Sequence, residues 1–123
     1  MDVGNAAHRD ILALIGQAER AETAAEVRDL VGRLRPMLAA HFAQEEAPGG
    51  LIGEARTRAP QQGDTLDLLV EQHHAMAGVL DALSEHPDQV AQLRALCATV
   101  RQHERREAEL LAAIAYDETG ALD

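Results

Sequence analysis

The sequence is poor in several residue types, and each shortage excludes a class of protein. Its 123 residues include a single cysteine, Cys97, so no disulfide can form within the chain, which fits a reducing cytoplasm. There is one Phe, one Tyr and no Trp. The chain therefore lacks the aromatic platforms on which the bases of single-stranded nucleic acid stack.

Positive charge and long apolar runs are also scarce. The formal net charge is −10, whereas binding to a phosphate backbone requires a basic patch. The apolar groups are too short to cross a bilayer. The first residues, Met-Asp-Val-Gly-Asn, show neither the basic segment nor the apolar core of a secretory signal. We therefore expect a cytoplasmic protein that binds neither nucleic acid nor membrane.

Helix-forming residues, by contrast, are abundant, and apolar residues recur among them with helical period. The length predicts one domain over residues 1–123. Four apolar stripes predict helices near residues 5–21, 24–47, 64–85 and 88–115. Two of the three connections are short, which predicts an all-α, antiparallel, up-down-up-down four-helix bundle.

Residues with known local preferences mark the ends of these helices. Thr23 and Glu26 have the spacing of a capping box at the start of the second helix. Pro36 lies inside that helix and is expected to kink it or to mark a local break. Residues 48–63 are expected to form a loop with a short packed turn near its start, followed by Asp64 as the cap of the third helix.

Each predicted helix carries one histidine within its apolar stripe, where helix geometry directs the side chain into the core. These histidines are His8, His41, His73 and His103. Residues of an antiparallel hairpin lie level when they are equidistant from its turn. His8 and His41 are symmetric about the first predicted turn, and His73 and His103 about the third. All four rings should therefore meet in one layer.

Two of these histidines have a glutamate four residues later. Glu45 follows His41, and Glu107 follows His103, so each carboxylate lies one turn from a ring on the same helix face. Burying these groups together is costly unless something ligates them. Imidazole and carboxylate suit iron, manganese or zinc, and carboxylates bridge metal pairs in helical bundles. We predict a site for two metal ions, with His8, His41, Glu45, His73, His103 and Glu107 as ligands.

Each of these features alone has an ordinary explanation. A single core histidine is more often a hydrogen-bonded structural residue, and a His-x-x-x-Glu pair is more often solvated. His74 lies on a more polar face than His73 and is expected to be exposed, although a shift of one residue would exchange the two. His86 is expected in a solvated turn. Glu46 and Glu104 are expected at the surface, as the two carboxylates nearest to supporting the ligands.

The residues around the histidines resemble those of hemerythrin-like, or HHE cation-binding, domains. The resemblance covers essentially the whole chain and is carried by Ala7–Leu12, His41–Glu46 and His103–Leu111. It implies a non-haem pair of iron ions, with manganese or zinc as possible substitutes. It also implies a small ligand such as O₂, NO or peroxide, or a role in handling iron, in sensing or stress response, with a possible redox partner.

The sequence differs from the oxygen-carrying hemerythrins that it resembles at two positions. Carriers have a second histidine one turn after the third one and an aspartate five residues after the fourth, and here these positions are Ala77 and Ala108. The family usually has Glu before the third histidine, and here it is Gln72. A site with open positions for O₂, peroxide or NO is therefore expected. Two alternatives stay open: a diiron oxidoreductase that turns over peroxide or NO, and a metal-free helical interaction module.

Overall fold

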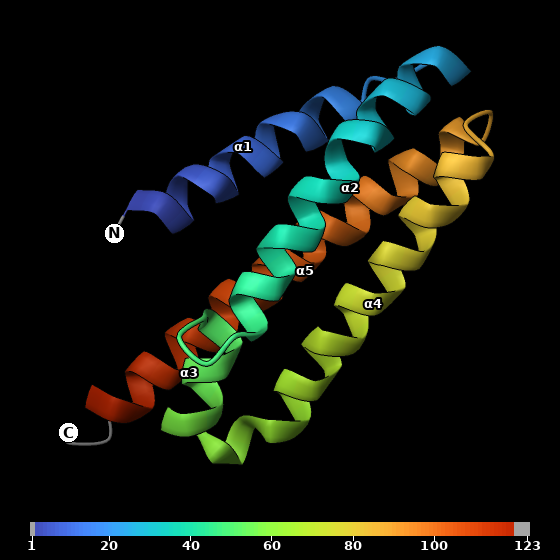
Figure 1. Ribbon diagram of the computed structural model, residues 1–123. Coiled ribbons are helices and arrows are strands. Elements are labelled where there is room, and N and C mark those ends of the chain that lie inside the picture. Colours follow the sequence, from blue (N-terminus) through green and yellow to red (C-terminus); the bar gives the residue numbers. More distant parts are fainter. Residues whose placement is uncertain (1, 120–123) are drawn as a thin grey trace.

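Long helices packed side by side form the frame of the molecule (Figure 1). The computed structural model describes residues 2–119, with side chains from residue 6 to residue 118, and within this range the chain contains no strand. The long helices are α1 (Asp2–Ala18), α2 (Ala24–Glu46), α4 (Gly63–Glu85) and α5 (Val90–Thr119). Successive long helices pack against each other, and α1 also packs on α5. The predicted all-α, up-down-up-down four-helix bundle is confirmed.

The helix boundaries follow the predicted caps at some ends only. The capping box is present: Thr23 Oγ1 accepts a hydrogen bond from the Glu26 backbone N–H, and the Glu26 carboxylate accepts one from the Thr23 backbone N–H, both at 3.1 Å. Asp64 does not cap α4, which begins at Gly63 without a side-chain cap. Pro36 does not break α2. The Gly32 carbonyl that Pro36 leaves without a helical partner lies on the exposed side, where water can satisfy it.

The prediction of a loop over residues 48–63 was wrong. The segment forms a helix, α3 (Leu51–Arg58), and a 3₁₀ turn, η1 (Pro60–Gln62). The helical period was missed because α3 is short and has few inward side chains, most of them alanine. They are Ile52 and Ala55, followed by Ala59. An Arg56–Asp67 ion pair at 2.8 Å links α3 to α4. The helix therefore covers the end of the bundle where α4 begins.

The apolar core is divided into two parts along the bundle. The larger part includes Phe42, Met76 and Val100, and the smaller part, beneath α3, includes Leu69 and Leu110. On α2, α4 and α5 the residues between the two parts are polar yet buried: Glu45, His73, His103 and Glu107. A polar layer therefore crosses the core. None of the helices in the described range is both long enough and apolar enough to cross a membrane.

Candidate metal centre

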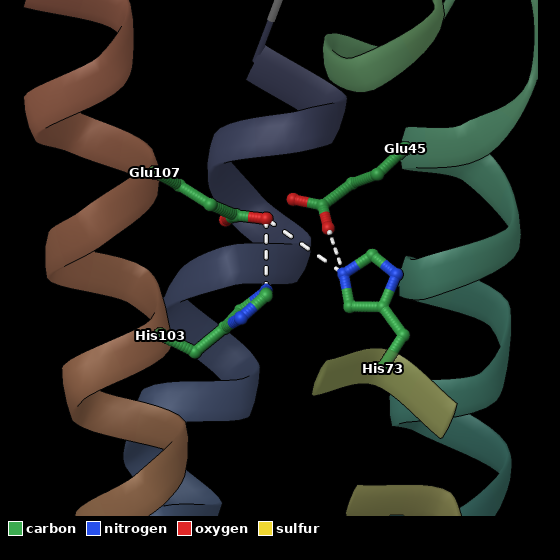
Figure 2. Close-up of side chains that lie close together, drawn as sticks. All are labelled: Glu45, His73, His103 and Glu107. Carbon is green, nitrogen blue, oxygen red and sulfur yellow. Dashed lines mark hydrogen bonds and ion pairs between the residues drawn. The ribbon is translucent and has the colours of Figure 1, made fainter. Parts of the chain in front are cut away.

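Four buried polar side chains from three helices point toward one another (Figure 2). We call them the inner group: Glu45 from α2, His73 from α4, and His103 and Glu107 from α5. Glu107 Oε2 lies 3.1 Å from His103 Nε2 and 3.8 Å from His73 Nε2, and Glu45 Oε1 lies 3.1 Å from His73 Nε2. One ligand atom from each residue lies within 4.8 Å of the others.

Three further side chains form an outer group beside the inner one. His8 comes from α1, His41 from α2 and Glu104 from α5. Glu104 Oε2 lies 3.1 Å from His8 Nδ1, and Glu104 Oε1 lies 3.8 Å from His41 Nε2. The His8 side chain is 37% exposed, whereas those of His41 and Glu104 are largely buried. The outer group is therefore closer to solvent than the inner group.

The Glu45 carboxylate connects the two groups. Its Oε1 faces His73 Nε2, and its Oε2 lies 3.2 Å from His41 Nε2. The spacing of His41 and Glu45, four residues apart on α2, places both on one helix face. Each oxygen of this carboxylate thus serves a different histidine, which is how carboxylates lie when two metal ions share them in a helical bundle.

The inner histidines are oriented by contacts on their far sides. His73 Nδ1 lies 2.7 Å from a Glu46 carboxylate oxygen, and His103 Nδ1 lies 2.7 Å from Gln72 Oε1. A carboxylate oxygen only accepts hydrogen bonds, so the neutral His73 ring carries its proton on Nδ1 and turns the lone pair of Nε2 inward. The Phe42 ring stacks on the same histidine, with 4.0 Å between centroids. The His73 ring is therefore held at its Nδ1 edge by Glu46 and on one face by Phe42.

Several inward-facing atoms of the layer make no hydrogen bond of suitable geometry among the described residues, although oppositely charged atoms face them at 3.1–3.8 Å. The atoms without such a hydrogen bond are His41 Nε2, Glu45 Oε1, His73 Nε2 and Glu104 Oε1. Buried polar atoms are normally hydrogen-bonded, and their exceptions require an explanation. Nitrogen and carboxylate oxygen atoms that converge without partners are suitable ligands for first-row divalent metals. The donor set therefore fits a pair of metal ions.

The layer also shifts the proton affinities of its members. Burial lowers the pKa of His73, but the facing carboxylates of Glu107, Glu45 and Glu46 outweigh it and raise the pKa to about 10. Burial raises the pKa of Glu104 to about 8, helped by the negative charges of Glu107 and Glu45. Burial also disfavours ionised Glu107, but hydrogen bonds from the inner histidines hold its pKa below the ordinary value. Without metal, protons neutralise part of the acidic layer.

A cavity of about 410 Å³ opens onto the outer group. Its lining includes His8, His41 and Glu104, together with the Gly50 backbone and the apolar Leu111 side chain. Neither inner histidine lines it. A small molecule or ion in this cavity would therefore meet the whole outer group but only the carboxylates, Glu45 and Glu107, of the inner group.

The structure brings together all six residues predicted as ligands, and it adds Glu104. The expectation that Glu104 is a surface charge was wrong, although it follows buried Cys97 by seven residues and Val100 by four and precedes Glu107 by three. That spacing was a usable signal. Of the remaining histidines, His74 and His86 are exposed, as expected. His73 is buried and His74 is exposed, so the register of α4 turns His73 toward the core.

The comparisons with known proteins agree with this geometry. Residues 5–115 match the hemerythrin HHE cation-binding domain, which is the family that the sequence resembles. Searches of curated proteins and of solved structures found no significant match. The family match covers both histidine-containing helix pairs and every residue of the inner and outer groups. The chain therefore belongs to the hemerythrin HHE cation-binding domain family.

Proposed function

We propose that this protein holds a non-haem diiron site, with which it binds or reacts with a small ligand such as O₂, NO or peroxide. The family match and the buried histidine and glutamate cluster both support cation binding. Iron is the metal that we favour, because it suits a mixed imidazole and carboxylate set and is oxidisable by such ligands. Manganese and zinc are the expected substitutes.

In this proposal each of the four helices supplies one terminal nitrogen ligand: His8, His41, His73 and His103. Glu45 and Glu107 would help to hold both ions. The contacts of Glu45 with one histidine of each group support its bridging role. For Glu107, the support is that its Oε2 faces the inner histidines while the residue also lines the cavity above the outer group.

The observation that carries the proposal is the set of buried atoms without partners. A metal-free interaction module would place such atoms in good hydrogen-bonding geometry or replace them by apolar side chains, because a buried polar group without a hydrogen bond costs about 1–3 kcal/mol. This layer instead presents nitrogen and oxygen atoms from four helices in two adjacent groups. Metal ligation removes that cost for all of them together.

The surrounding side chains determine what reaches the site. Buried Leu38, Leu69 and Val100 keep bulk water away from the layer. Ala108 lines the cavity and Ala77 lines a groove between α2 and α4, and neither carries an atom that binds metal. Bound iron supplies open coordination positions and exchangeable electrons. His8 and His41, which line the cavity, would hold the iron next to this accessible space.

Metal content of paired variants tests the proposal. Protein that is purified anaerobically and reconstituted with Fe²⁺ should contain about two ions per chain. His73→Ala should lose most of its metal because it removes a buried ligand, whereas His74→Ala, which changes the adjacent exposed residue, should retain it. Equal metal contents in the two variants would show that the ligands are misassigned.

The reaction with oxygen tests the chemistry separately. We expect the diferrous protein to undergo a one-way oxidation in air, because Ala77 and Ala108 provide no ligand where oxygen carriers have one. The measurement is the optical spectrum through repeated cycles of oxygen exposure and evacuation. Recovery of the reduced spectrum after each cycle would contradict this expectation and indicate reversible oxygen carriage.

A further inference from the structure

The two groups of candidate ligands differ in burial and in composition. The inner group has two histidines and two glutamates, all buried, on α2, α4 and α5. The outer group has two histidines and one glutamate of intermediate burial, and it depends on α1 for His8. Both can draw on Glu45, whose carboxylate lies between His41 and His73. A metal ion would therefore experience two different environments.

Glu104 completes the outer group. One of its oxygens lies 3.1 Å from His8 Nδ1, and the other, which is buried and has no hydrogen-bond partner among the described residues, faces His41 Nε2 at 3.8 Å. His41 Nε2 is itself buried and without a hydrogen-bond partner. With the nearer Glu45 oxygen, these atoms supply four ligands of the types that first-row divalent ions accept.

Access to solvent distinguishes the groups further. The cavity of about 410 Å³ is lined by His8, His41 and Glu104, so an ion can enter or leave the outer position directly. The inner histidines are covered: Phe42 stacks on His73, and Gln72 lies against His103. An inner ion would therefore be held on its histidine side by covered rings, with only the carboxylates Glu45 and Glu107 of its group on the cavity.

We propose that Glu104 is a ligand of the outer metal ion only, and that this outer position binds metal more weakly and exchanges it faster than the inner position. This inference rests on the proposed two-metal function and adds an order of loading to it. The inner ion is the resident one, and occupancy of the outer position follows the concentration of available metal. The two-metal form exists only when that concentration is sufficient.

Titration of the metal-free protein with Zn²⁺ by calorimetry, and with Co²⁺ by its absorption spectrum, tests this inference. We expect two steps, with the second dissociation constant at least about tenfold larger than the first. Glu104→Gln should preserve the first step and weaken the second by at least about tenfold. Glu109→Gln changes an exposed carboxylate on the same helix and should leave both steps unchanged.

A second variant keeps the test decisive if Glu104→Gln does not fold, as judged by circular dichroism. His8→Ala removes a partly exposed ligand of the same group and should lose the same step. In crystals soaked with less than one equivalent of Co²⁺, the anomalous signal should lie within the inner group, and with excess Co²⁺ a second signal should appear beside Glu104.

The possible failures are distinguishable. Two steps of equal affinity in the wild-type protein, or an unchanged second step in Glu104→Gln, would overturn the inference and leave the two-metal function intact. Binding of no more than one ion at saturating metal would contradict the two-metal function itself.

Discussion

The burial and the pKa of Glu104 depend on the residues around it and not on its being a glutamate. Arg105 and Arg106 follow it on α5, yet both are exposed, whereas Glu104 turns toward α1 and meets His8. Burial and two neighbouring carboxylates raise its pKa to about 8. The same layer raises the pKa of His73 to about 10. These two groups hold protons where the proposed metal ions would bind, so they set the pH dependence of the metal-free protein.

The metal-free protein should lose stability as the pH rises from about 6 to about 9. The folded-state pKa values of about 10 for His73 and about 8 for Glu104 exceed their ordinary values of 6.5 and 4.5. A raised pKa stabilises the folded state fully below the ordinary value, and this contribution is lost as the pH rises through the folded-state value. The stabilisation that comes from the lowered pKa of Glu107 is complete above its ordinary value of 4.5, so it does not change between pH 6 and pH 9. Denaturant unfolding at both pH values measures the change.

A control accompanies this measurement. Metal affinity should rise as the pH rises, because protons compete with metal ions for His73 and Glu104 and are released when metal binds. Metal-free Glu104→Gln should lose less stability than the wild type over the same pH range. A larger free energy of unfolding at pH 9 than at pH 6 in the metal-free wild type would refute the assignment of these protonated groups.

At the scale of elements, α3 shows how a close backbone approach shapes the site. The Gly49–Gly50 turn brings the chain from α2 directly into α3, and Leu51 at the start of α3 lines the cavity. A Cβ atom on Gly50 would lie 1.9 Å from the Gln44 carbonyl oxygen, so only glycine fits there. The backbone dihedrals of Gly50 are extended, which makes the requirement one of space and not of conformation.

Gly50→Ala should therefore destabilise the protein by about 1–3 kcal/mol, because α3 must move away from the end of α2. Gly49→Ala is the matched control: nothing lies within 4 Å of its Cβ position. We expect the control to change the free energy of unfolding by no more than about 0.5 kcal/mol. The measurement is chemical denaturation of both variants in metal-free form. Equal stabilities would mean that α3 does not pack as closely as described.

At the scale of the whole molecule, a polar layer whose burial costs free energy lies between two apolar clusters that pack the helices together. The larger apolar cluster, which includes Ile15, Leu34 and Leu93, extends away from the layer toward the α1–α2 and α4–α5 turns. The smaller cluster closes the opposite end beneath α3. Ion pairs such as Arg101–Glu19, at 2.6 Å, hold α1 against α5 near the first turn. The helices thus have packing partners that do not depend on metal.

Removal of metal should lower the melting temperature without unfolding the helices at room temperature. Ligand binding to the folded state contributes about 4 kcal/mol when free metal exceeds its dissociation constant a thousandfold. For a domain of this size the corresponding shift is about 10 °C or more. Thermal melts followed by circular dichroism, with and without chelator, measure it. His73→Ala should show little shift, and an identical melting temperature of the wild type in both conditions would argue against a metal site in the core.

Much of the architecture was readable from the sequence because it depends on local periodicity. Four apolar stripes predicted the bundle, and Thr23 with Glu26 predicted the start of α2 correctly. The apolar stripe of α4 continues through His73 and not through His74, and the structure buries His73 accordingly. Helical period and the symmetry of hairpins are enough to place four histidines at one height.

Tertiary structure decided what periodicity cannot encode. The helix in residues 48–63 was missed because its apolar face is short and is completed by residues of α4 and α5, such as Leu66 and Leu110. The spacing of Glu104 from Cys97 and Val100 indicates that it faces inward, but its contact with His8 depends on which side of α5 is covered by α1, and the sequence of α5 alone does not contain that information. The division of the candidate ligands into a covered inner group and an accessible outer group arises for the same reason: burial depends on neighbouring helices, and the sequence of one helix specifies only its own faces.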